Sequence, residues 1–152
     1  MGTAGHEFEL SVVLPVFNEA EVIGSVVDRT VEYLEGCGID YEINLVDDGS
    51  ADATPSVVRE MCHRNPRLRW LRHESNRGYG AALRTGISAA RGRRILVSDG
   101  DGQFPIEGLG TLWECRDDAD MVLGFRNPRR DPWFRRLGGW IWGRVIVRLA
   151  FG

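Results

Sequence analysis

Ser98-Asp99-Gly100-Asp101-Gly102-Gln103-Phe104-Pro105 is the stretch that decides how this 152-residue sequence is interpreted. It follows an apolar run at 95–97 that predicts a strand, and a helix is expected to begin near Pro105. Carboxylates at positions i and i+2 after a strand project to the same side, because side chains on a strand repeat every two residues. Asp99 and Asp101, with the amide oxygen of Gln103, therefore suit Mg²⁺ or Mn²⁺. The glycines leave room for a bulky ligand such as a diphosphate.

Two other interpretations use the same residues. Asp-Gly pairs are common turn formers, so the motif taken alone fits a plain turn equally well. The two aspartates and Gln103 also fit the first ligand positions of a calcium-binding loop. Such a loop requires a glycine turn and a bidentate glutamate where this sequence has Phe104 and Gly110, so a calcium loop is excluded.

Apolar runs and helical periodicities alternate along the chain, whose 43% hydrophobic and 27% charged content is ordinary for a globular domain. Strands are expected at 10–16, 41–46, 68–72, 94–98 and 120–124, and helices at about 22–36, 52–64, 81–90 and 105–116. This alternation predicts an α/β fold with a mainly parallel sheet, and the length predicts a single domain.

Polar, small or charged residues follow each of the five expected strands. The loops are Phe17-Asn18-Glu19, Asp47-Asp48-Gly49-Ser50, Asn76-Arg77-Gly78, Asp99-Gly100-Asp101-Gly102-Gln103 and Gly124-Phe125-Arg126. Ligands of parallel α/β sheets bind beyond the carboxyl ends of the strands. The series therefore favours one site for a metal-bound diphosphate over a set of plain turns.

Taken together, these motifs resemble family 2 glycosyltransferases of GT-A fold, in particular dolichol-phosphate mannose synthase-like polyprenyl-phosphate sugar transferases. The resemblance runs through 12–19, 46–54, 76–82, the acidic motif and 124–126, and covers nearly the whole chain. It implies a Rossmann-like, mainly parallel sheet flanked by helices. It also implies metal-dependent, inverting transfer of a sugar from a nucleotide-diphosphosugar, UDP- or GDP-linked, to a polyprenyl phosphate.

The resemblance assigns roles to individual residues. Those implied to bind the nucleotide-sugar are Pro15, Phe17, Asn18, Glu19, Asp47, Asp48, Asn76, Gly78, Asp99 and Gly100. Among them, Asp48 would accept a hydrogen bond from the base and Asp47 would support its loop. Asp99, Asp101 and Gln103 would hold Mg²⁺ or Mn²⁺. Asp99, Asp101 and Arg126 are the implied catalytic residues, and Arg126, Arg135 and Arg136 would bind the acceptor phosphate.

Charge is distributed unevenly along the chain. All 19 basic residues are arginine, and residues 126–152 carry seven of them against one Asp, a net charge of +6, which leaves −9 on residues 1–125. A basic end on an acidic body predicts an anionic partner there and argues against nucleic acid. The resemblance implies that residues 1–125 bind the nucleotide-sugar and that residues 126–152 begin an incomplete acceptor part. Its apolar faces would then be exposed. The chain is therefore expected to be a fragment, a truncated reading frame, or a protein completed by a partner or by self-association into a homo-oligomer.

The same C-terminal part holds three of the five tryptophans, Trp133, Trp140 and Trp142, among arginines. This composition fits an interfacial segment on an anionic membrane surface or a segment buried in protein equally well. No secretory signal and no spanning run of ~18 apolar residues is found. Three widely spaced cysteines predict buried free thiols. His6, His63 and His73 lie outside every motif and are expected to be surface or packing residues. We expect a cytoplasmic protein, peripheral at the inner face of the cell membrane.

Two alternative functions remain for the sequence. One is a transferase acting on a saccharide hydroxyl, which would require a general base that the chain does not obviously supply. The other is a nucleotide-sugar-binding module without turnover. The sequence is compatible with a uracil or a guanine nucleotide and with any of several sugars.

Overall fold

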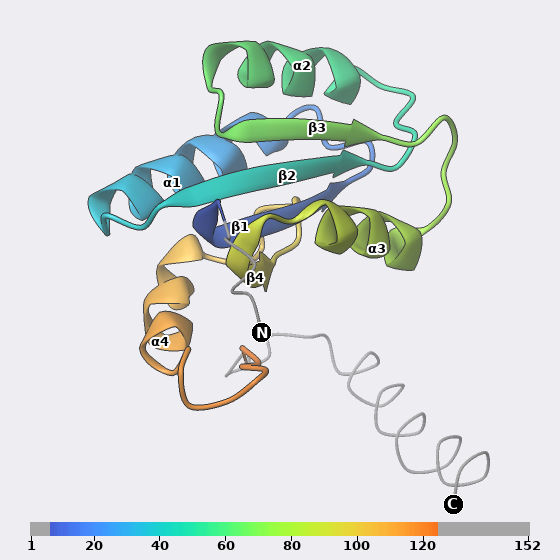
Figure 1. The fold of residues 1–152 in the computed structure, drawn as a ribbon. Coiled ribbons are helices and arrows are strands. Elements are labelled where there is room, and N and C mark those ends of the chain that lie inside the picture. The colour runs from blue at the N-terminus through green and yellow to red at the C-terminus, as the bar shows by residue number, and fades with distance from the viewer. Residues whose placement is uncertain (1–6, 125–152) are drawn as a thin grey trace, which may run out of the picture. The chain divides into compact units, whose positions relative to one another are not determined.

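A four-stranded parallel sheet is the centre of the fold, in a computed structural model that describes residues 7–124 (Figure 1). The strands are β1 Phe8–Val16, β2 Tyr41–Asp47, β3 Leu68–Arg72 and β4 Gly92–Val97. Their order is β3-β2-β1-β4, and all three pairings are parallel. The chain therefore moves outward from β1 to β3 and then returns to place β4 on the other side of β1.

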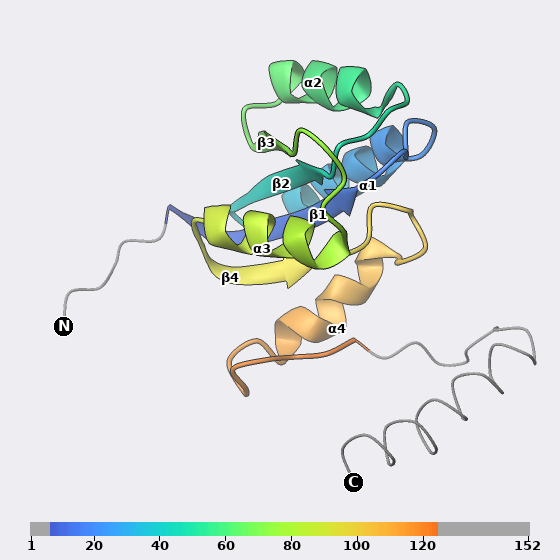
Figure 2. The same cartoon turned by 90° about the vertical axis from the view of Figure 1, so that its right-hand side faces the viewer.

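Three helices connect the strands and cover both faces of the sheet: α1 Ile23–Gly36, α2 Thr54–Arg64 and α3 Tyr79–Ala89 (Figures 1 and 2). The 3₁₀ turn η1 Ile106–Gly108 and α4 Leu109–Glu114 follow β4. Right-handed crossovers put α1 and α2 on one face, and α3 on the other, because the direction of strand addition reverses after β3. Residues up to Thr111 form one compact unit, and Leu112 begins a second.

The core lies along β1 and β2, which are buried on both faces. This is why both strands read as nearly continuous apolar runs in the sequence. Val13 and Val46 point toward α3, where they meet Ala82. All three side chains are fully buried. The close packing of α3 on β1 and β2 fixes where the amino end of α3 reaches the edge of the sheet.

Gly86 in α3 makes this close packing possible. A Cβ atom at this position would collide with the Val13 side chain and lie 3.0 Å from Val46 Cγ2. We expect Gly86→Ala to lower the free energy of unfolding by about 1–3 kcal/mol through overpacking. Gly80→Ala in the same helix is the matched control, since its Cβ would meet open space and helix propensity favours alanine. Urea unfolding measures both, and equal stability of the two variants would contradict this account.

A buried carboxylate joins the strands at the end of the sheet opposite the carboxyl ends. Glu42 in β2 is fully buried. It accepts hydrogen bonds from the Ser11 hydroxyl at 2.7 Å and from the Arg91 amide at 2.7 Å. The Arg91 guanidinium adds two bonds, at 2.9 and 2.7 Å, and Arg69 Nη1 lies 3.4 Å away. Residues from β1, β2 and β3, together with Arg91 directly before β4, therefore share one polar network around Glu42.

The strand expected at 120–124 is not formed in the structure, so this prediction was wrong. Residues 121–124 are irregular, and Met121 and Leu123 are 74% and 79% exposed. An extended segment needs a neighbouring strand for its backbone groups, and within residues 7–124 none pairs with this one. The helix expected at 105–116 is divided into η1 and α4. Glycines at 108 and 110, which are poor helix formers, lie at this division.

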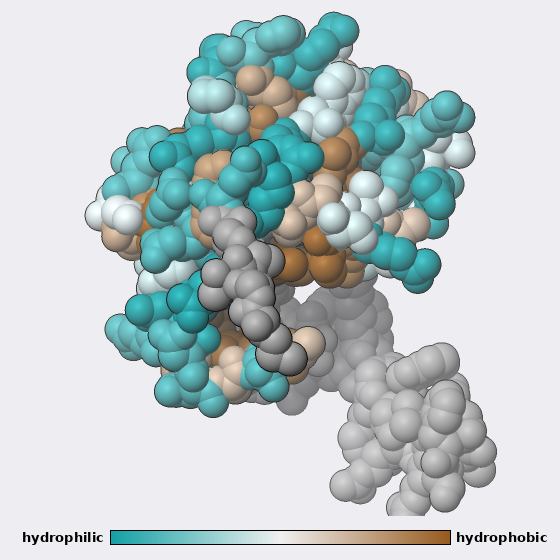
Figure 3. Space-filling view, in the orientation of Figure 1, coloured by the Kyte–Doolittle hydropathy of each residue, from teal (hydrophilic) through white to brown (hydrophobic). Residues whose placement is uncertain are grey.

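Exposed apolar side chains gather near β4. The large ones are Ile95 and Val97 on β4 and Ile87 on α3, and the space-filling view shows apolar surface in this region (Figure 3). Among the described residues, β4 pairs only with β1, so its other edge is unpaired. Alternation of half-buried and exposed residues along β4 follows from this edge position.

The predicted burial of the cysteines was wrong for two of the three. Cys37 and Cys115 are exposed, and Cys62 is half-buried, where burial raises the pKa of its thiol. No helix in residues 7–124 has the length and hydrophobicity needed to cross a bilayer. The predictions for Phe125, Arg126, Arg135, Arg136 and the three C-terminal tryptophans lie outside the described residues.

Candidate functional site

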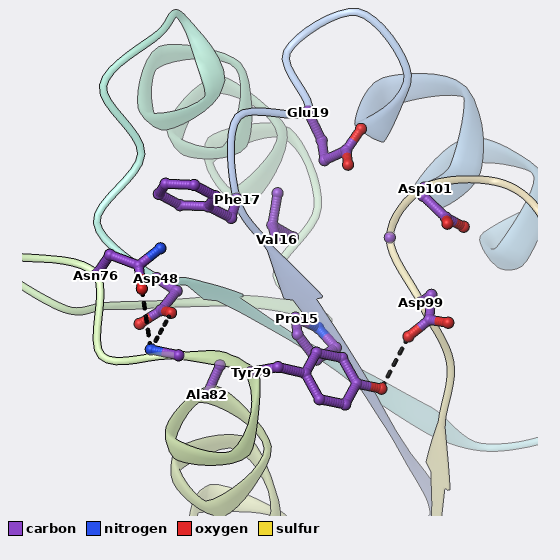
Figure 4. A pocket seen from close by; sticks show the side chains of 12 residues that line it. Pro15, Val16, Phe17, Glu19, Asp48, Asn76, Tyr79, Ala82, Asp99 and Asp101 are labelled. Atoms are coloured by element: carbon purple, nitrogen blue, oxygen red, sulfur yellow. Dashed lines mark hydrogen bonds between the residues drawn. The ribbon is translucent and has the colours of Figure 1, made fainter. Parts of the chain in front are cut away.

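A pocket of about 280 Å³ opens at the carboxyl ends of β1 and β4 (Figure 4). It is lined by Pro15, Val16, Phe17, Glu19, Asp48, Asn76, Gly78, Tyr79, Ala82, Asp99, Gly100 and Asp101. This is where the strand order reverses, the usual ligand position of an open α/β sheet. Four of the five loops predicted to converge do so here, and the fifth, at 124–126, lies largely outside the described residues.

The pocket has two chemically different ends. Figure 4 shows Phe17, Asp48 and Asn76 at one end and Asp99 and Asp101 at the other. Pro15 and Tyr79 lie between them. The first end offers an exposed aromatic face and a fixed acceptor, and the second offers carboxylates. This arrangement suits an elongated ligand with a flat polar ring at one end and a charged group at the other.

Three residues predicted to belong to the site do not line the pocket: Asn18, Asp47 and Gln103. The first two hold the neighbouring loops together. Asn18 adopts a left-handed backbone conformation (φ 56°), and its Oδ1 accepts from the Ala51 amide at 2.9 Å. Asp47 is buried; its Oδ1 accepts from the Ser50 amide at 2.8 Å, and its Oδ2 lies 3.3 Å from Arg72 Nε. The Asn18 bond joins the loops after β1 and β2, which both contribute lining residues. The Asp47 contacts shape the loop after β2 and connect it to the end of β3.

Asp48 organises the first end of the pocket. Its Oδ1 accepts from His73 Nδ1 at 2.6 Å and from the Arg77 amide at 2.9 Å, and its Oδ2 accepts from the Gly78 amide at 2.8 Å. Burial alone raises the pKa of this carboxyl. The bonds from the Arg77 amide, the His73 ring and the Gly78 amide outweigh burial and leave the pKa below its ordinary value. Asp48 is therefore an ionised acceptor that shapes the loop before α3.

His73, predicted to be a surface or packing residue, is buried, and it also contacts the site residue Asp48. It is only 6% exposed, and its Nε2 lies 2.9 Å from Thr85 Oγ1 of α3. One weak signal was present in the sequence: His73 directly follows β3 and so lies at a strand end, like the predicted site residues. It lacks any recognisable motif of its own.

Gly49 brings the loops after β2 and β3 into contact. Its φ is +76°, and a Cβ atom there would lie 2.5 Å from the Ser75 carbonyl carbon and 2.6 Å from the Asn76 nitrogen. Only glycine avoids both the strained conformation and this clash. The close approach holds Asn76 beside Asp48.

Tyr79 extends from the amino end of α3 to the acidic end of the pocket. Its hydroxyl donates to Asp99 Oδ1 at 2.8 Å. Burial first, and then this hydrogen bond and the nearby charges of Asp99 and Asp101, raise the pKa of Tyr79 to about 12. The phenol therefore stays protonated at neutral pH and acts as a donor that orients Asp99.

The carboxylates at the acidic end of the pocket are chemically suited to a hard divalent cation. Asp99 and Asp101 line the pocket, and within residues 7–124 neither carboxylate pairs with an arginine. The backbone amide of Gln103 donates to Asp101 Oδ1 at 2.9 Å, and this bond keeps Gln103 beside the Asp101 carboxylate. The described chain has no cluster of three or more His, Cys, Asp or Glu side chains suited to a metal. A cation held by Asp99 and Asp101 would therefore need further ligands besides the His, Cys, Asp and Glu side chains of residues 7–124 to complete its coordination.

Comparison with known proteins gives a family match over most of the chain. The family model described as "Glycosyl transferase family 2" matches residues 11–147. An undecaprenyl-phosphate 4-deoxy-4-formamido-L-arabinose transferase from Edwardsiella ictaluri is 38% identical over 142 residues, which cover 91% of this chain and 43% of the relative. A dodecaprenyl-phosphate galacturonate synthase from Rhizobium johnstonii is 35% identical over 146 residues, covering 93% and 43%. The chain thus spans less than half the length of these relatives.

Solved structures support the fold. The mannosyltransferase PcManGT from Pyrobaculum calidifontis, in complex with GDP-Man and Mn²⁺, superposes with a TM-score of 0.67 at 28% identity, covering 81% of this chain and 37% of that one. Glucosyl-3-phosphoglycerate synthase from Mycobacterium tuberculosis gives a TM-score of 0.59 at 24% identity, covering 75% and 41%. The predicted GT-A fold is confirmed.

Proposed function

This chain belongs to glycosyl transferase family 2, and we propose from this premise that it binds a nucleotide-diphosphosugar and a divalent cation as the donor-binding part of a polyprenyl-phosphate sugar transferase. The observation that carries the proposal is the pocket at the switch point of the sheet. It brings together eight of the ten residues predicted to bind the donor, all except Asn18 and Asp47, and it also includes Asp101.

The base of the nucleotide is proposed to bind at the end formed by Phe17, Asp48 and Asn76. Phe17 is 44% exposed and offers a ring face for stacking. Asp48 is an ionised acceptor, which suits a base with a ring N–H, as in uracil or guanine. The complex of PcManGT with GDP-Man and Mn²⁺ supports a nucleotide-sugar and a cation in this fold.

The diphosphate is proposed to extend toward Asp99 and Asp101, which would hold Mg²⁺ or Mn²⁺ together with Gln103. A cation bound there would neutralise charge on the diphosphate and make it a better leaving group. The protein's own contribution is positional. Tyr79 orients Asp99 through its hydroxyl, and Gly100 lets the loop lie against β1, because a Cβ atom there would be 2.8 Å from the Pro15 carbonyl oxygen.

The acceptor is proposed to be a polyprenyl phosphate, because the names of the two relatives include undecaprenyl phosphate and dodecaprenyl phosphate. We place this acceptor at the cytoplasmic face of the membrane. Arg126, Arg135 and Arg136 would bind its phosphate through bidentate contacts. Such a phosphate is already ionised at neutral pH, so the transfer needs no dedicated general base. In-line displacement by its oxygen would invert the anomeric centre.

Calorimetric titration of the 152-residue chain tests the donor half of this proposal. With Mn²⁺ present, we expect either UDP or GDP to bind with a Kd in the range of about 1 μM to 1 mM. EDTA should weaken this binding strongly, whereas any weak binding of the free nucleoside should not depend on Mn²⁺. Absence of binding by both nucleotides in Mn²⁺ would refute the proposed function.

A further inference from the structure

A buried histidine connects the base end of the pocket to α3. His73 lies after β3, with its Nδ1 at 2.6 Å from Asp48 Oδ1 and its Nε2 at 2.9 Å from Thr85 Oγ1. Its backbone amide also donates to the Asp47 carbonyl at 2.9 Å. The His73 and Asp48 side chains are each 5% exposed. The ring is thus held from both sides in a place that solvent hardly reaches.

The partners of His73 fix which ring nitrogen carries hydrogen. Asp48 is ionised and can only accept, so His73 Nδ1 must donate to it. In the neutral ring, Nε2 then accepts from the Thr85 hydroxyl. These hydrogen bonds allow only one orientation of the His73 ring and one of the Asp48 carboxylate. Reversing either group would leave a buried polar atom without its partner.

The contacts of Asp48 leave one acceptor position open. An ionised carboxylate has about four lone-pair sites. Two on Oδ1 are taken by His73 and the Arg77 amide, and one on Oδ2 is taken by the Gly78 amide. The remaining site is on Oδ2 of a residue that lines the pocket.

We propose that His73 is a positioning residue for base selection: it holds Asp48 so that the open acceptor site on Oδ2 faces the bound base. This inference rests on the proposed function. Uracil and guanine present a ring N–H to such an acceptor, whereas cytosine and adenine present a lone pair at the corresponding ring nitrogen. The carboxylate therefore favours the first two bases by attraction and disfavours the others by repulsion.

Two substitutions separate the two ring contacts. In His73→Asn, the side-chain amide nitrogen stands near the position of Nδ1 and keeps a donor to Asp48. In His73→Gln, the amide reaches toward the position of Nε2 and Thr85, and the donor to Asp48 is lost. Thr85→Val keeps the histidine and removes only the hydroxyl that holds its far side.

The readout is the ratio of affinities within two pairs of nucleotides, UDP against CDP and GDP against ADP, measured by calorimetry in Mn²⁺. UDP and GDP carry the ring N–H. We therefore expect the wild-type chain to prefer UDP to CDP if it binds the first pair, and GDP to ADP if it binds the second. His73→Gln should reduce this preference about tenfold, and His73→Asn should largely retain it. Thr85→Val should give a smaller reduction and tests the inference independently if His73→Gln does not fold.

A purely structural histidine would give a different result. Its replacement would weaken the binding of both nucleotides of a pair equally and leave the ratio of their affinities unchanged. That outcome in His73→Gln or Thr85→Val would overturn this inference and leave the proposed function standing. Absence of binding by the wild-type chain would instead refute the proposed function and base selection with it. Positioning is then decided without nucleotide by ¹³C NMR titration of the Asp48 carboxyl. His73→Gln should raise its pKa and His73→Asn should not; equal values in the two variants would overturn the positioning role.

Discussion

Replacing Asp101 with asparagine is expected to weaken Mn²⁺-dependent nucleotide binding by about 100-fold. The substitution removes a negative charge from the proposed cation site while keeping the shape of the side chain. Changes to residues that only orient metal ligands already cost about 10–100-fold in other proteins, so loss of a ligand charge should reach at least the upper part of this range. In calorimetry, the affinity of the variant in Mn²⁺ should fall to that of the wild-type chain in EDTA.

The structure offers a control for this substitution. Asp28→Asn makes the same chemical change at an exposed position of α1 that does not line the pocket, and its binding should remain that of the wild-type chain. The Asp101→Asn variant should also fold normally, because the amide oxygen of asparagine can still accept from the Gln103 amide. Wild-type affinity of Asp101→Asn in Mn²⁺ would remove this residue from the cation site.

Replacing Arg91 with methionine is expected to give the largest loss of stability, about 3 kcal/mol at pH 7. The methionine keeps much of the apolar stem, but Glu42 loses its two guanidinium bonds while remaining fully buried. Breaking a buried ion pair from one side costs about 3–5 kcal/mol. We expect the lower end, because Ser11 still donates and Arg69 remains 3.4 Å away. Urea unfolding measures the change, with the exposed neighbour Arg93→Met as control.

The pH dependence identifies the cause of this loss. Burial alone raises the pKa of Glu42, but bonds from the Ser11 hydroxyl, the Arg91 amide and the Arg91 guanidinium hold it below the ordinary value of 4.5. A carboxyl whose pKa is lower in the folded state stabilises the protein above its unfolded pKa and loses this effect as the pH falls through the folded pKa. The cost of Arg91→Met should therefore be largest at neutral pH and shrink below about pH 4.

A second substitution tests the same explanation at constant pH. Glu42→Gln in the Arg91→Met background removes the buried charge that lost its partner. The double variant should therefore be more stable at pH 7 than the sum of the two single losses predicts. Simple additivity would show that the two residues do not interact strongly.

The sequence predicted the sheet well because burial on both faces leaves a clear pattern. The runs at 10–16 and 41–46 are nearly all apolar, which a parallel strand covered by helices requires. The site could be predicted for a related reason. Parallel strands have their carboxyl ends at the same edge of a sheet. This rule alone predicts that Asp48 and Asp99, 51 positions apart in the sequence, lie in one site.

Contacts that depend on side-chain geometry were not predictable in this way. His73 reaches Asp48 across 25 positions, and Arg91 reaches Glu42 across 49. Neither pair has a spacing that a periodic pattern or a local motif would reveal. The strand expected at 120–124 failed for the opposite reason, since its local pattern was suitable but a strand also requires a neighbour.

The position of β1 in the sheet also has a consequence for biosynthesis. β1 is made early but lies between β2 and β4, and its Ser11 hydroxyl accepts from the Gly92 amide, 81 positions later in the chain. At about 5–20 residues per second, a ribosome needs roughly 4–16 seconds to make that interval. During this time the apolar edge of β1 has no β4 to pair with. We therefore expect the nascent chain to depend on chaperones until β4 has left the ribosome, because no hairpin of neighbouring strands can form first.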